Sequence, residues 1–188
     1  MQRQPTLLSS CARATTAAEA RFRINAPAFT HRNSRVVALD LGAAAAVRDM
    51  ARRQQPWGGG HFLVFESALP DDALLRRTPG TPGEGAPAEG SAETGDAATA
   101  LLSEELSGAD TVVMVASAED GSGSRGSAAA ASIIGDAAAA RGIMSAGLVI
   151  PGDGSPDEVV TALRPNAMVL VVLREATDLP EVLTALRV

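Results

Sequence analysis

The residues best suited to chemistry lie in one short turn, residues 117–126, with the sequence SAEDGSGSRG. Its centre holds small residues: Gly121, Ser122, Gly123 and Ser124. Glycines let backbone amides point inward, the serines add hydroxyl donors, and the helix expected next would contribute its positive end. A turn of this composition could bind a phosphate group.

Two acidic residues complicate this interpretation. Glu119 and Asp120 immediately precede the glycines, and Arg125 offsets one negative charge at most. Two carboxylates would repel a di- or triphosphate unless a metal ion bridged them. We therefore favour a structural role for residues 121–124, as a tight connection between a strand and a helix. A surviving phosphate loop is the alternative.

A second candidate turn is the segment DLGAAA at residues 40–45. A dinucleotide-binding turn reads G-x-G-x-x-G, but Gly42 is the single glycine here. We expect the β-carbons of Ala43 and Ala44 to hinder the approach of a pyrophosphate. Asp40 could bind a ribose or a metal ion, but we favour a turn residue at the end of a strand.

The remaining polar residues give no pattern typical of catalysis or metal binding. His31 and His61 have no acidic or cysteine partner at ligand spacing, and we expect both in loops or on the surface. We interpret the acidic pairs at 71–72 and 104–105 as exposed caps and solvated helix faces. Cys11 lies in the amino-terminal tail without an argued partner. We predict no catalytic residue and no metal ligand.

The elements that must position these turns alternate between two periodicities. Apolar runs predict strands, at residues 34–41, 61–66, 111–116, 143–150 and 167–173. Patterns of helical spacing lie between and after them, at residues 42–53, 72–77, 98–106, 127–140, 156–164 and 180–186. Ser155 with Glu158, and Asp178 with Glu181, have the spacing of capping boxes.

Strands that are apolar on both faces and alternate with helices imply a buried parallel sheet. We predict a single α/β domain over residues 34–188: a three-layer, Rossmann-like, doubly wound and mostly parallel sheet with helices on both faces. Residues 78–97, rich in Pro, Gly, Ala and Glu, are expected to form a mobile internal loop.

Residues 1–33 contain five arginines and a single acidic residue. We expect a flexible tail on a cytoplasmic protein. The alternative is an organellar transit peptide, because such peptides are rich in arginine and poor in acids.

Composition excludes several classes of function. All sixteen basic residues are arginine, so there is no lysine for a Walker-A loop or a Schiff base. One cysteine allows no intrachain disulfide and no thiolate cluster. The net charge of −6 argues against nucleic acid as a partner. No apolar run approaches the ~20 residues of a membrane span.

Several segments resemble the tubulin/FtsZ superfamily. Residues 108–150 resemble the strand, the signature loop G-G-G-T-G-[ST]-G, the helix and the strand of that family, with residues 119–125 in the place of the signature. Residues 36–50 resemble its first strand, glycine-rich loop and helix, and residues 59–67 its second strand. Residues 162–175 resemble the strand that contacts the ribose, with Arg174 in place of the usual Asn. The resemblance implies GTP or GDP as ligand.

The motifs depart from the family at the positions that would bind nucleotide. The first loop has lost nearly all its glycines, and two acids replace two glycines of the signature. We also expect the chain to lack the family's long central helix, its hydrolysis-completing loop and its second domain. The sequence thus predicts a non-catalytic, degenerate relative with no cofactor, whose partner is a protein, either a filament-forming homologue or itself. The alternative is a nucleotide-binding module or a dinucleotide-dependent oxidoreductase.

Overall fold

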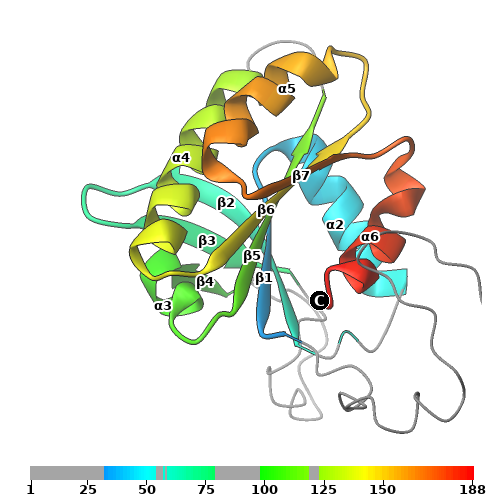
Figure 1. Ribbon diagram of the computed structural model, residues 1–188. Coiled ribbons are helices and arrows are strands. Elements are labelled where there is room, and N and C mark those ends of the chain that lie inside the picture. The colour runs from blue at the N-terminus through cyan, green and yellow to red at the C-terminus, as the bar shows by residue number, and fades with distance from the viewer. Residues whose placement is uncertain (1–31, 54–56, 58, 79–97, 119–122) are drawn as a thin grey trace, which may run out of the picture. The chain divides into compact units, whose positions relative to one another are not determined.

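The computed structural model of the chain describes residues 32–53, 57, 59–78, 98–118 and 123–188. The chain divides into two compact units, residues 1–30 and residues 31–188, and all described residues belong to the second. The amino-terminal tail, Cys11, His31 and nearly all of the predicted loop at 78–97 lie outside the described residues. Figure 1 shows the second unit as a twisted sheet with helices packed against it.

The sheet has seven strands in the spatial order β4-β3-β2-β1-β5-β6-β7. Their bounds are Ser34–Ala38 (β1), Gly60–Ala68 (β2), Ala73–Arg77 (β3), Thr99–Leu101 (β4), Thr111–Ser117 (β5), Met144–Ile150 (β6) and Val169–Val172 (β7). The pairs β1–β2, β1–β5, β5–β6 and β6–β7 are parallel, whereas β2–β3 and β3–β4 are antiparallel. The prediction of an α/β protein with a mostly parallel sheet is confirmed.

The helices are α2 (Leu41–Arg53), α3 (Leu102–Leu106), α4 (Gly123–Ala140), α5 (Pro156–Leu163) and α6 (Leu179–Ala185). Two short 3-10 helices, Arg164–Asn166 and Ala176–Asp178, flank β7. Among the described residues, no helix is long and apolar enough to cross a membrane.

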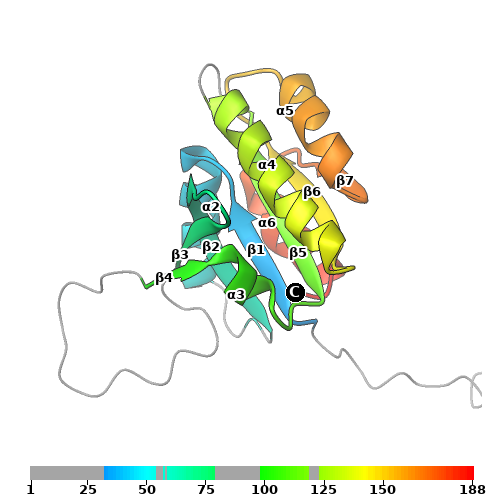
Figure 2. The same cartoon turned by 90° about the vertical axis from the view of Figure 1, so that its left-hand side faces the viewer.

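Every residue of β1 and β5 is buried, as expected for central strands covered on both faces. Alternate residues of these strands belong to two separate hydrophobic clusters, because neighbouring residues of a strand point to opposite faces of the sheet. Val36 joins the cluster that contains residues of α2 and α6. Val37 joins the cluster that contains residues of α3, α4 and α5. Figures 1 and 2 show the same grouping of helices around the sheet.

The segment at 72–77, predicted as a short helix, is a strand over most of its length. Residues 73–77 form β3, which pairs antiparallel with β2 and β4. Ala73 and Leu75 are buried and point to the same face, as expected for a strand, in which every second residue faces the same way. An apolar pattern this short does not distinguish a strand from a helix. The predicted helix at 98–106 likewise begins with the strand β4 and becomes helical at Leu102.

One predicted capping box forms at another place. Ser155 caps α5, since its hydroxyl accepts a bond from the N–H of Asp157, with Pro156 in the first turn, but no reciprocal bond from Glu158 accompanies this cap. Asp178 makes no side-chain cap to α6. Its carboxylate instead accepts the N–H of Glu175, and the two residues close a capping box around the 3-10 helix Ala176–Asp178. The turn after β7 therefore begins three residues earlier than the sequence pattern indicated.

Candidate functional site

The natural ligand position of this fold lies between β1 and β5. The connection through α2 leads from β1 to β2, and the connection through α4 leads from β5 to β6, on the other side of β1 in the sheet. In doubly wound sheets ligands bind outside the carboxyl ends of the two strands at which the order reverses. Both turns singled out in the sequence follow these two strands.

Asp40 lies at this point and its carboxylate is surrounded by donors. Its Oδ1 accepts the N–H of Ala43 at 2.8 Å and the hydroxyl of Ser117 at 2.6 Å. Its Oδ2 accepts the N–H of Ser117 at 2.9 Å and the hydroxyl of Ser127 at 3.0 Å. One side chain thus connects the ends of β1 and β5 with the first turn of α2 and the second turn of α4.

The bond from Ala43 makes Asp40 the N-cap of α2, a position at which aspartate is preferred. The carbonyl oxygen of Asp40 also accepts the N–H of Ala44 at 2.9 Å, the first bond of the helix. The prediction that Asp40 is a turn residue at a strand end agrees with this geometry. Sequence reasoning did not foresee that it also binds two serines.

Gly42 lies in the first turn of α2 and is partly exposed. The neighbouring Ala43 and Ala44 are fully buried in the hydrophobic cluster shared with α6. Their methyl groups therefore face the core, and this burial does not support the expectation that they hinder a pyrophosphate.

The second turn is only partly described. Gly121 and Ser122 lie outside the described residues, as do Glu119 and Asp120. Gly123 and Ser124 begin α4, which therefore starts four residues earlier than predicted. Ser127, which is 2% exposed, is a site residue that the sequence analysis missed. The available signal was the polar residues at the ends of two apolar runs, Asp40 and Ser117, which a parallel sheet places side by side.

Four donors at the described part of the site bind the carboxylate of Asp40: the N–H groups of Ala43 and Ser117 and the hydroxyls of Ser117 and Ser127. The same carboxylate places a negative charge among them. Among the described residues no cluster of three or more His, Cys, Asp or Glu side chains could hold a metal ion.

A second polar cluster, centred on Glu105, lies where the parallel strands begin. The prediction that residues 104–105 are a solvated pair was wrong for Glu105, whose side chain is 1% exposed. Its carboxylate contacts Arg35 Nε at 3.0 Å, Arg77 Nη2 at 2.6 Å and His61 Nδ1 at 3.3 Å. His61, expected in a loop or on the surface, is a half-buried residue of β2.

In this cluster the pKa values of the acid and of the histidine are both lowered. Burial by itself raises the pKa of Glu105, but the bonds and charges of Arg77, His61 and Arg35 outweigh it and lower the pKa. Burial and the nearby charge of Arg35 lower the pKa of His61 against the opposing effect of Glu105. Each charged group has an ionic or hydrogen-bonding partner, so the cluster is structural.

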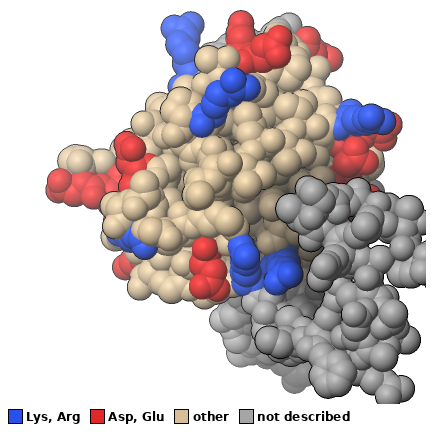
Figure 3. Space-filling model, in the orientation of Figure 1, with Lys and Arg blue, Asp and Glu red and all other residues tan. Residues whose placement is uncertain are grey.

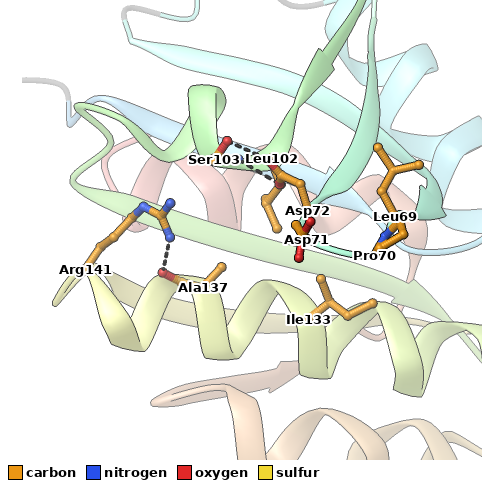
Figure 4. A pocket seen from close by; sticks show the side chains of 9 residues that line it. All are labelled: Leu69, Pro70, Asp71, Asp72, Leu102, Ser103, Ile133, Ala137 and Arg141. Carbon is orange, nitrogen blue, oxygen red and sulfur yellow. Dashed lines mark hydrogen bonds between the residues drawn. The ribbon is translucent and has the colours of Figure 1, made fainter.

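A shallow pocket of about 280 Å³ lies between the β2–β3 turn, α3 and α4. Figure 4 shows that Asp72, Ser103 and Arg141 are bonded to neighbouring residues. Asp72 accepts the hydroxyl and the N–H of Ser103, and Arg141 donates to the carbonyl of Ala137 at 3.0 Å. The pocket therefore offers a ligand no evident set of convergent, unpaired groups.

No protein-family model matches the chain, and a search of curated proteins finds no match. Among solved structures, the chain is similar to proximal thread matrix protein 1 from the mussel byssus, with 10% identity and a TM-score of 0.35. The match covers 82% of this chain and 44% of that protein, so the chain spans less than half of its length.

Proposed function

We propose that this chain is a non-catalytic protein that acts by binding other proteins, with its ligand position closed by its own Asp40. The observation that carries the proposal is the set of four hydrogen bonds to that carboxylate from Ala43, Ser117 and Ser127. These donors belong to the two turns that would bind nucleotide in a relative with that activity.

Charge adds to the occupied donors. A phosphate oxygen placed 4 Å from the carboxylate would be repelled by about 4 kcal/mol at an effective dielectric constant near 20. That energy corresponds to roughly a thousandfold loss of affinity. Removing Asp40 would leave buried donors without an acceptor, which is also unfavourable. The bonds around Asp40 are therefore consistent with a stable fold that has given up nucleotide binding.

Isothermal titration of the full chain with GTP and with GDP, each with and without Mg²⁺, tests this proposal. We expect no binding in the micromolar range. Micromolar binding of either nucleotide would contradict the proposal and would favour the alternative of a nucleotide-binding module. The same titration with NAD and NADP tests the oxidoreductase alternative.

The Asp40→Asn variant sharpens the test, since it removes the charge and keeps nearly the same volume. Asp136→Asn, an exposed position on α4, is the matched control. If Asp40 closes the site, the first variant should bind GTP or GDP better than the wild type does, and the control should not. A measurable unfolding transition shows that each variant is folded.

We extend the proposal to one kind of partner, a filament-forming homologue of the tubulin/FtsZ superfamily. The support for this finer form is the resemblance of residues 36–50 and 108–150 to that family. In this form of the proposal, the chain binds one end of a filament and caps it. Co-sedimentation with such a filament tests this form, and an unchanged polymer mass and length would count against it.

A further inference from the structure

β7 is an unprotected edge of the sheet. Within the described residues it pairs with β6 alone, and all four of its residues are aliphatic. Three apolar side chains at this edge are exposed: Met168 to 77%, Val169 to 42% and Val172 to 48%. Figure 2 shows β7 at the right-hand margin of the sheet. The middle of the face in Figure 3, over which β7 runs in Figure 1, is free of charged colours.

The opposite edge differs. β4 has only three residues, one of them a threonine, and a very short strand is a common protection against edge pairing. β7 has no charge, no proline and no bulge in its register with β6. An edge of this kind is a template for another strand.

The backbone of β7 also has groups directed away from the sheet. The N–H of Leu173 donates to the carbonyl of Val149 at 2.9 Å. In a parallel ladder alternate residues bond to the same neighbour, so Val169 and Val171 also face β6. The N–H and C=O groups of Leu170 and Val172 then face outward, and no backbone bond outside the sheet is recorded for them in the described part of the chain.

We propose that β7 pairs antiparallel with β7 of a second copy of this chain, about a two-fold axis at Val171. This register places Leu170 opposite Val172 of the second copy, and the reverse, so that all the outward-facing groups of both residues are used. Val171 of one chain lies opposite Val171 of the second, and these two residues form no backbone hydrogen bonds with each other. The exposed aliphatic side chains of each strand then cover those of the other.

The charges at the two ends of β7 fit this arrangement. The exposed Arg164 precedes the strand, whereas Arg174, Glu175 and Asp178 follow it with a net charge of −1. An antiparallel two-fold pair brings the basic end of one copy to the acidic end of the other.

A ladder of this length buries less area than a standard interface of about 1,600 Å². We therefore expect a reversible dimer whose population rises with concentration. The inference rests on the proposed protein-binding role and names one partner for it. The nucleotide titrations test the closed ligand position, whereas self-association tests the edge, so the two can fail separately.

Cysteine cross-linking tests the register in the full chain carrying Cys11→Ser. Val171→Cys should form a disulfide-linked dimer under mild oxidation, because cross-strand pairs without hydrogen bonds lie close together. Val169→Cys is the matched control, since it is more exposed than Val171. Its two copies would be about four residues, or ~13 Å, apart along the strands, beyond the reach of a disulfide. Equal cross-linking of both variants, or none for Val171→Cys, would overturn the register.

Sedimentation velocity over micromolar to millimolar concentrations tests the association itself. The wild type should shift toward the dimer as concentration rises, and Val172→Lys should remain monomeric. Leu69→Lys is the control, because Leu69 is 42% exposed and lies away from β7 in the β2–β3 turn. A wild type that is monomeric throughout, or a dimer that Val172→Lys leaves unchanged, would overturn the proposal.

Discussion

The carboxylate of Asp40 and Ser117 hold the two central strands of the sheet together at their carboxyl ends. Asp40 follows β1 and Ser117 ends β5, and the serine donates both its N–H, at 2.9 Å, and its hydroxyl, at 2.6 Å. The residues are 77 positions apart in the sequence. This contact lies where the two connections of the sheet diverge.

Removing the hydroxyl of Ser117 should weaken the fold. Ser117→Ala leaves the Asp40 carboxylate with one donor fewer in a partly buried place, at a cost of about 1–3 kcal/mol. Ser132→Ala, an exposed serine on α4, is the control and should change little. The free energy of unfolding from urea denaturation measures both. A Ser117→Ala variant as stable as the control would show that this bond contributes nothing net.

Replacing Glu105 should lower the free energy of unfolding far more than the same replacement of its neighbour Glu104. Glu105→Gln removes the counter-charge of Arg35, whose side chain is 6% exposed, and breaking a buried ion pair typically costs about 3–5 kcal/mol. Glu104→Gln makes the same chemical change on the exposed side of α3 and should stay within about 0.5 kcal/mol of the wild type. Urea unfolding of both variants gives the comparison. Equal effects would mean that the cluster does not anchor α3 to the sheet.

The lowered pKa of His61 predicts that the protein loses stability on mild acidification. Its pKa is lowered in the folded state from an ordinary value of 6.5, so between the two pKa values the unfolded chain binds more protons than the folded one. Stability is therefore full above pH 6.5 and falls as the pH drops through that value toward the folded pKa. The unfolding free energy measured from pH 7.5 to 5.5 should decline in the wild type. The decline should be smaller in His61→Gln, and an identical slope would rule out His61 as its source.

The class of the fold could be predicted from the sequence, but the antiparallel edge of the sheet and the polar contacts could not. The long apolar runs of β1, β5 and β6 predict a buried parallel sheet because strands covered on both faces need no polar residues. The segment at 73–77 has no such length, and its pairing with β2 and β4 decides that it is a strand.

The same limit applies to the polar clusters. The sequence identified Asp40 as a turn residue, because a polar residue directly after an apolar strand is a local signal. The partners Ser117 and Ser127 come from other elements and are set by the register of β1 and β5. Glu105 looks like its exposed neighbour Glu104, and only the docking of α3 against Arg35 and Arg77 distinguishes the two.

Two glycines of α4 should respond in opposite directions to alanine. A β-carbon at Gly135 would lie 2.6 Å from the β-carbon of Asn166, in the 3-10 helix before β7, whereas one at Gly126 would meet nothing within 4 Å. Alanine is favoured over glycine in helices by about 1 kcal/mol, so Gly126→Ala should stabilise the protein by up to that amount. Gly135→Ala gains the same propensity but forces α4 away from Asn166, and overpacking of this kind typically costs about 1–3 kcal/mol. Thermal unfolding of both variants should give a higher Tm for Gly126→Ala and a lower Tm for Gly135→Ala. If both variants gain stability, α4 does not pack tightly against Asn166, and the placement of the segment leading into β7 would have to be revised.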